Sequence, residues 1–179
     1  RELIADTDLH AVADALLLAR RSLREQFCRL DDMIVRLARH DEVTRRFMTV
    51  PGVGPLVALT FRATVDVPSR FTRSRTVGAH FGLTPRKQQS GEVDRNGRIS
   101  RWGDEMMRSL LYEAGQVLLT RVKRWSALKA WGARISRRRG HKKAIIALAR
   151  KIAVILHRMW IDGTEFDWGK RPETAASSI

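Results

Sequence analysis

Leucine recurs every seven residues near the start of the chain, at positions 9, 16, 23, 30 and 37. Val12, Ala19 and Met33 each follow a leucine by three residues, and Gln26 takes the same place in another heptad. A strict seven-residue apolar repeat keeps two helices in contact only if they supercoil around each other. Residues 1–48 are therefore predicted to form a long coiled-coil helix, which either dimerises or folds against its own domain.

Charge separates this first segment from the rest of the chain. Residues 1–48 hold nine arginines and nine acids, whereas the remainder holds 25 Lys or Arg (34 − 9) against ten acids (19 − 9). The whole net charge of +15 thus lies after residue 48, and a basic domain of this kind is expected to bind a polyanion. The neutral helix instead favours contact with a second copy of the chain, which predicts a homo-oligomer with at least two copies.

The segment "VPGVGPLVA", residues 50–58, has the pattern of a helix-hairpin-helix turn. Pro51 is expected to end the long helix, and the next helix is expected to start near Pro55. Gly52 and Gly54 would let backbone amides at that helix N-terminus approach a DNA phosphate without a side chain in the way. The alternative is a helix-helix turn that needs glycine only for its backbone conformation.

Apolar spacing predicts a mainly α domain over residues 49–170, followed by a loose tail at 171–179. A short helix is expected at 73–82, and Asp104 and Ser126 are expected to cap helices that run to about residues 122 and 135. The apolar side of a last helix runs from Ile145 to Met159. A short hairpin is possible within residues 84–101.

The polar stretch "QQSGEVDRNGRISRWGD", residues 88–104, is the strongest candidate for chemistry. A serine hydroxyl is a weak nucleophile, so Ser90 would need a base or cations that stabilise the charge formed on an attacked phosphate. Four basic residues could supply that field and three glycines could give close backbone approach: Lys87, Arg95, Arg98 and Arg101, with Gly91, Gly97 and Gly103. The plain alternative is a serine that is an ordinary loop hydroxyl.

A second basic run, residues 134–143, contains no acid and suits a phosphate track or a solvated helix edge. Its candidate nucleic-acid contacts are Arg137, Arg138, Arg139, Lys142 and Lys143. The five tryptophans, Trp102 among them, are expected to be packing residues rather than a stacking platform. The single cysteine, Cys28, fits a reducing compartment such as the cytoplasm. The histidines share no ligand spacing, so no metal site is predicted, although Glu92 and Asp94 could hold Mg²⁺.

Four segments together resemble a known family. "VPGVGPLVA", "FGLTPRKQQSG", "RNGRISRWGDEMMRSLL" and "RRGHKKAIIALARKIAVILHRMW" are similar, in order and spacing, to the C-terminal domain of the bridge-RNA-guided insertion-sequence transposases. The resemblance covers residues 49 to about 168, and the heptad helix is similar to that family's dimerising coiled coil.

The resemblance implies a serine-dependent DNA transposase. Ser90 matches the family serine that attacks a phosphodiester, while Gly97, Arg98 and Gly103 match a step expected to position backbone and phosphate. A structured guide RNA and Mg²⁺ held by a RuvC-like acidic domain are further implied, and that domain lies outside these 179 residues. Two other hypotheses remain: a non-catalytic DNA- or RNA-binding and dimerisation module, and a nuclease that uses Glu92 and Asp94.

Overall fold

The computed structural model describes residues 6–90 and 93–169 and divides the chain into two compact units, Arg1–Leu37 and Ala38–Ile179. The described residues form seven α-helices, one short 3-10 helix and a two-stranded antiparallel sheet. The prediction of a mainly α fold with a long first helix is confirmed. The predicted loose tail lies outside the described residues.

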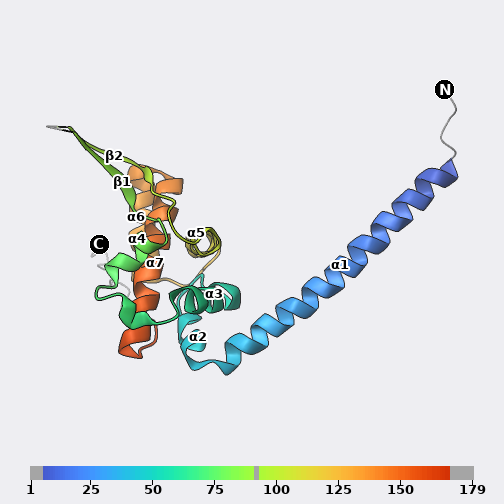
Figure 1. Cartoon of the computed structure of the whole chain (residues 1–179), viewed down its shortest axis with the longest axis horizontal. Helices are drawn as coiled ribbons and strands as arrows, with labels where there is room; N and C mark the ends of the chain where they lie inside the picture. The colour runs from blue at the N-terminus through green and yellow to red at the C-terminus, as the bar shows by residue number, and fades with distance from the viewer. Residues whose placement is uncertain (1–5, 91–92, 170–179) are drawn as a thin grey trace, which may run out of the picture. The chain divides into compact units, whose positions relative to one another are not determined.

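The long helix α1 spans Asp6–His40 (Figure 1). The five leucines of the heptad repeat are 55% to 72% exposed, and Val12, Phe27 and Met33 are also exposed. An apolar stripe of this length on one helix gains about 1.5–3 kcal/mol for each large side chain that a partner surface buries. The stripe is thus the face of α1 through which association would be favourable.

The helix predicted to continue to Pro51 is interrupted at Asp41, so that prediction is corrected. Asp41 caps a separate short helix, α2 (Glu42–Phe47), by accepting a hydrogen bond from the Thr44 backbone N–H at 2.8 Å. Its carboxylate also accepts the Thr44 hydroxyl and pairs with Arg62. Burial acts to raise the pKa of Asp41, but the two Thr44 hydrogen bonds and the Arg62 guanidinium outweigh it and lower the pKa below the usual value.

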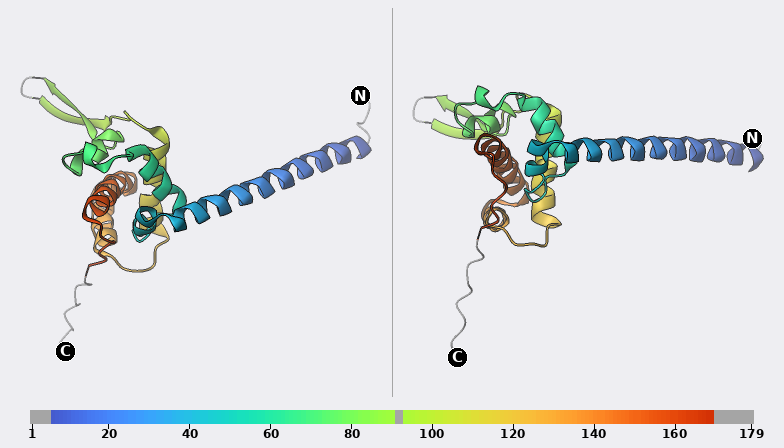
Figure 2. Two further views of the ribbon diagram at one scale, coloured as in Figure 1. Left: turned by 60° about the horizontal axis from the view of Figure 1, so that its bottom comes forward. Right: turned by 90° about the horizontal axis from the view of Figure 1, so that it is seen from below.

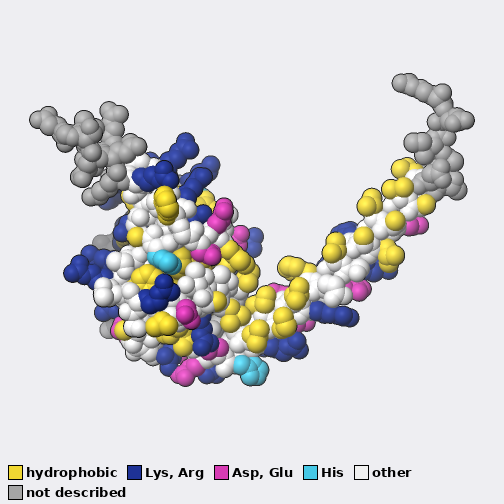
Figure 3. All heavy atoms as spheres, in the orientation of Figure 1, with side chains coloured by type: hydrophobic (Ala, Val, Ile, Leu, Met, Phe, Trp, Pro, Cys, Tyr) yellow, Lys and Arg dark blue, Asp and Glu magenta, His cyan; other side chains and the backbone are white. Residues whose placement is uncertain are grey.

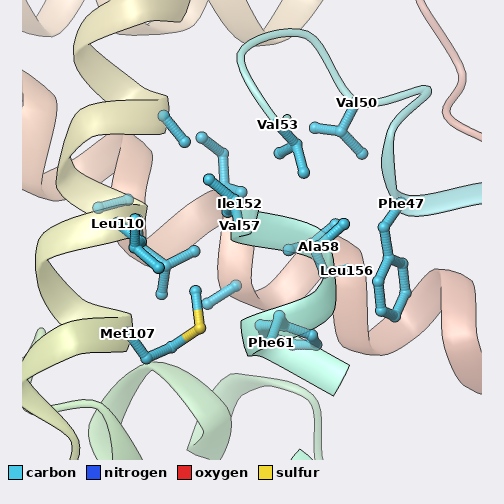
Figure 4. Packing of buried hydrophobic residues seen from close by; sticks show 14 of the residues in the cluster. Phe47, Val50, Val53, Val57, Ala58, Phe61, Met107, Leu110, Ile152 and Leu156 are labelled. Carbon is cyan, nitrogen blue, oxygen red and sulfur yellow. The ribbon is translucent and has the colours of Figure 1, made fainter. Parts of the chain in front are cut away.

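The core of the second unit lies between α2, α3 (Pro55–Val65), α5 (Glu105–Thr120) and α7 (His141–Asp162). Phe47 meets Phe61 edge to face with ring centroids 5.4 Å apart, and Ile152 and Leu156 of α7 face them (Figure 4). Val50 and Val53, from the turn before α3, point into the same cluster (Figure 4). The "PGVGP" turn is therefore fixed by the core on the side that carries its valines.

Two predicted helix caps are confirmed. The Asp104 side chain accepts a hydrogen bond from the Met107 N–H at the start of α5, and Ser126 accepts one from the Lys129 N–H at the start of α6 (Ala127–Arg139). Each such cap satisfies an N–H that the helix itself leaves unpaired. The two caps fix where α5 and α6 begin, and both helices contribute residues to the core.

A buried histidine ties the segment before α4 (Arg75–His80) to α7. His157 is fully buried, and its Nε2 lies 2.8 Å from the Pro68 carbonyl oxygen in the 3-10 helix η1 (Pro68–Arg70). Because a carbonyl only accepts, Nε2–H donates there, and in the neutral ring Nδ1 accepts the Ser74 hydroxyl at 3.0 Å. This pairing holds the chain that leads into α4 and the hairpin.

Strands β1 (Pro85–Ser90) and β2 (Val93–Ile99) form an antiparallel hairpin, as the sequence allowed. The expected polar loop is therefore a two-stranded ribbon over most of its length. The ribbon projects from the helices beside α4, and the chain then passes from β2 into α5 (Figures 1 and 2).

Candidate nucleic-acid interface

The base of the hairpin is clamped to the end of α4 by two glycines. Gly103 has φ +85°, and a Cβ on it would lie 1.9 Å from the His80 carbonyl oxygen. Gly82 has φ +66°, and its Cβ would lie 2.3 Å from the Trp102 carbonyl oxygen. Contacts this close exclude every side chain, so glycine is required at both positions. Two backbone hydrogen bonds complete the clamp, from Ser100 N to Thr84 O at 2.9 Å and from Arg101 N to Gly82 O at 3.2 Å.

A register shift just above this clamp gathers arginines. Pro85 pairs with Ile99 and Lys87 with Asn96, so β2 contains one residue more than β1 over this interval. Such a bulge bends the strand and redirects side chains. Arg86 and Arg98 thereby meet Arg101 around an open hollow of about 320 Å³, which Gly97 and Ile99 complete.

The hollow is positively charged and is held by backbone contacts. Arg86 donates to the Ser100 carbonyl at 3.1 Å, and Arg108 of α5 donates to the Arg101 carbonyl at 3.0 Å. Among the side chains that the structure describes, no carboxylate forms an ion pair with Arg86, Arg98 or Arg101. Three exposed guanidiniums without a described counter-charge repel one another, and a phosphate would relieve that repulsion through charge-assisted hydrogen bonds.

The outcome for the predicted residues of the ribbon is mixed. Arg98, Arg101 and Gly97 meet at the hollow, and Arg86, which the sequence reasoning missed, joins them. Ser90 ends β1 with its backbone opposite Val93. The side chains of Lys87, Ser90 and Arg95, like Gly91, lie outside the described residues. Only the bulge makes Arg86 a member of the cluster, and a bulge leaves no signal in the spacing of charges.

The second basic cluster surrounds the junction of α6 and α7. The five predicted residues are all exposed, with Arg137–Arg139 in the last turn of α6 and Lys142 and Lys143 in the first turn of α7. Cations suit a helix C-terminus, whereas the two lysines sit at a helix N-terminus, where the dipole disfavours positive charge. Lys and Arg side chains gather over the part of the compact domain beside the hairpin (Figure 3).

The two glycines of the predicted helix-hairpin-helix turn have different surroundings. Gly52 has φ +91°, and its Cβ would lie 2.4 Å from the Ala114 carbonyl oxygen, so packing against α5 accounts for glycine there. Gly54 caps α3 and has no atom within 4 Å of an added Cβ. The open backbone of the turn is thus at Gly54, and phosphate contact at either glycine stays a prediction.

One tryptophan departs from the prediction that all five are packing residues. Trp131 and Trp160 pack against the core, and Arg124 lies over the ring of Trp168 at 4.0 Å. Trp102, which follows the hollow residue Arg101 in the chain, is 74% exposed. The expectation of a packing role is therefore wrong for Trp102.

The described part of the chain offers neither a metal-binding cluster nor a membrane-spanning helix. Those residues contain no group of three or more His, Cys, Asp or Glu that could hold a metal ion. The alternative Mg²⁺ pair is not tested, because Glu92 and the Asp94 side chain lie outside the described residues. None of the described helices combines the length and apolar character needed to span a membrane.

The exposed arginines at the base of the ribbon and the basic α6–α7 junction would suit a polyanion, and comparison with known proteins gives these clusters their context. Residues 44–132 match the model of the transposase IS116/IS110/IS902 family. The chain is 33% identical over 168 residues to a Sinorhizobium fredii protein that carries the transposase name y4pF/y4sB, covering 90% of this chain and 43% of that protein. It is 36% identical over 127 residues to the Coxiella burnetii transposase for insertion sequence element IS1111A, which covers 70% of this chain and 35% of that protein. It is 31% identical over 127 residues to the Yersinia enterocolitica transposase for insertion sequence element IS1328, which covers 70% of this chain and 38% of that protein.

The chain belongs to the IS116/IS110/IS902 transposase family, which confirms the resemblance seen in the sequence. It spans about two fifths of the length of these curated relatives. The family model begins at α2 and ends within α6, so it includes the hairpin and the arginine hollow.

Proposed function

We propose that this chain is the DNA-binding and strand-transferring part of a transposase that moves an insertion sequence. The observation that carries the proposal is the arginine hollow on the same ribbon as Ser90, in a chain of a transposase family. The hollow offers up to three guanidiniums to a phosphate, and the ribbon links it directly to the serine.

The spacing along β1 supports a positioning role for the hollow. Arg86 and Ser90 are four residues apart, which is about 14 Å at roughly 3.4 Å per strand residue. That length corresponds to about four base-pair steps measured along the axis of B-DNA, at roughly 3.4 Å each. Arg86, Arg98 and Arg101 would therefore hold the DNA backbone some way from the bond that is cut and would align that bond with Ser90.

The proposed chemistry at Ser90 is a phosphodiester exchange. The serine oxygen forms a bond to phosphorus as the bond from phosphorus to one deoxyribose oxygen breaks, leaving a phosphoserine–DNA ester. The serine proton passes to a base, and the departing sugar oxygen takes up a proton. Attack by a second sugar hydroxyl on the ester then restores the serine and joins the strands, so the number of phosphodiester bonds is conserved.

The partners in this proposal are DNA, a structured guide RNA and a second copy of the chain. Mg²⁺, held by an acidic RuvC-like domain, would neutralise the charge that develops on the phosphate. The exposed leucine stripe of α1 is the proposed contact between copies, since a heptad repeat matches itself across a two-fold axis. Residues 1–48 are thus proposed as the dimerising segment and 49–170 as the strand-transfer domain.

A transposition assay with a matched pair of serine variants tests the proposal. In a transposase that joins this chain to the acidic domain, Ser90→Ala is expected to abolish strand joining while DNA binding and helical content stay unchanged. Ser100→Ala, at the end of the same ribbon, is the control and is expected to retain joining. Full joining by the Ser90 variant would instead leave the chain as a non-catalytic binding and dimerisation module.

A further inference from the structure

Trp102 combines an exposed side chain with an immobilised backbone. At 74% exposure it is the most exposed large apolar side chain among the described residues. Two residues with positive φ flank it, Arg101 at +58° and Gly103 at +85°. A non-glycine residue in that region carries a conformational cost that only surrounding structure can offset. The chain therefore adopts a costly backbone conformation directly beside an indole that is exposed to solvent.

The contacts that hold this backbone come from both neighbouring helices. Gly82, just after α4, lies against the Trp102 backbone N and O atoms on the side where a Cβ would be. Arg108 of α5 donates a hydrogen bond to the Arg101 carbonyl. A backbone fixed in this way removes the backbone part of the conformational entropy loss when the ring binds a flat ligand. The Trp102 backbone is thus held in place while its indole is exposed to solvent.

The chemistry beside Trp102 selects the ligand. Arg101 precedes it directly and lines the hollow with Arg86 and Arg98. A cationic groove with an adjoining exposed aromatic ring is the combination by which proteins bind unpaired nucleotides, with the groove on the phosphates and the ring on a base. In a paired duplex the faces of the bases are covered by their neighbours, so only a base outside the stack can lie on the ring.

We propose that Trp102 stacks on an unpaired nucleobase whose adjoining phosphate occupies the Arg86–Arg98–Arg101 hollow. This inference rests on the nucleic-acid binding in the proposed function, and it is independent of the Ser90 chemistry. It predicts that the base of the ribbon binds distorted or strand-separated nucleic acid in preference to a fully paired duplex. Because stacking reads no base identity, the preference applies to any sequence.

Binding of three labelled probes to the 179-residue chain tests the proposal by fluorescence anisotropy. The first probe is a 20-base-pair DNA duplex, and the second is the same duplex with a two-nucleotide gap in one strand. The third probe is the gapped duplex made of RNA. Trp102→Ala is expected to weaken binding to gapped DNA about 5- to 150-fold, which corresponds to about 1–3 kcal/mol of base stacking. The fully paired duplex is expected to change less than about twofold. Trp102→Phe is expected to recover most of the loss, and the RNA probe shows whether the ring also accepts RNA.

A matched control removes an exposed apolar side chain elsewhere. Ile161→Ala, on an exposed position of α7, is expected to leave all three affinities unchanged. Equal loss on the paired and gapped duplexes in the Trp102→Ala variant would overturn the stacking inference while leaving DNA binding intact. A drop in the molar mass of that variant would also overturn it, because the ring would then be buried between copies. Failure of the unaltered chain to bind any probe would overturn both this inference and the proposed function.

Discussion

The clamp at the base of the hairpin predicts a large cost for adding one methyl group. In Gly103→Ala the new Cβ would sit 1.9 Å from the His80 carbonyl oxygen, where an ordinary contact is 3.4 Å or more. The positive φ costs about 1–2 kcal/mol for a residue with a side chain, and displacing packed backbone costs about 1–3 kcal/mol more. The free energy of unfolding is therefore expected to fall by about 2–5 kcal/mol.

Gly163→Ala separates these two terms. Gly163 also has a positive φ, +66°, but its Cβ would meet only the tip of the Arg46 side chain, at 3.4 Å. Its expected loss is about 1–2 kcal/mol, from the backbone alone. Urea unfolding followed by circular dichroism gives both values. Where the strain is relieved locally, hydrogen exchange at the Ser100 and Arg101 amides is expected to accelerate in the Gly103 variant. Equal stabilities and unchanged exchange would refute the clamp.

Three further predictions concern the charge, the helix and the first cap. Arg98→Ala is expected to weaken binding to any DNA sequence and to reduce the slope of log affinity against log salt by about 0.7–0.9, measured by anisotropy at several salt concentrations; an unchanged slope would mean that Arg98 contacts no phosphate. Leu23→Glu is expected to halve the molar mass seen by light scattering, whereas Cys28→Glu, on the outer side of the heptad, is expected to leave it unchanged; equal masses for both would exclude the leucine seam. Asp41→Asn is expected to lower stability by about 0.5–1 kcal/mol at pH 6. Because the folded pKa of Asp41 is lowered, its contribution is present above the unfolded value near 3.8 and is lost as the pH falls through the lower folded value. The difference between the two proteins is therefore expected to shrink as the pH is lowered below 3.8, and a pH-independent difference would contradict the charge argument.

The sequence predicted the helices well where one residue decides a boundary. Asp104 and Ser126 each have a side chain that can accept the first free N–H groups of a helix, and both caps are confirmed. The break at Asp41 was missed although a signal existed. The next member of the heptad after Leu37 is Thr44, a polar residue that the structure buries against Asp41. A polar residue at a seam position, close to an aspartate that can cap a helix, therefore marked the end of the heptad repeat.

The candidate site was predictable only in part. The spacing of Arg98 and Arg101 indicated a cationic pocket, but membership of Arg86 depends on a strand bulge, which is a property of pairing between two segments. Trp102 was assigned to packing because the five tryptophans do not form the aromatic series that is typical of a single-strand binder. In the fold, Gly82 packs against the Trp102 backbone and the side chain stays exposed, and no local pattern contains that information.

The central claim is that Ser90 becomes covalently joined to DNA, and trapping the joined species tests it most directly. In a protein that joins this chain to the acidic domain, a nicked DNA substrate that lets the cut strand diffuse away would accumulate the ester. Denaturing electrophoresis and mass spectrometry of the proteolysed adduct are predicted to find a nucleotide on the peptide that contains Ser90. A nucleotide found on another residue, or cleavage and joining without any protein-bound DNA, would contradict the account.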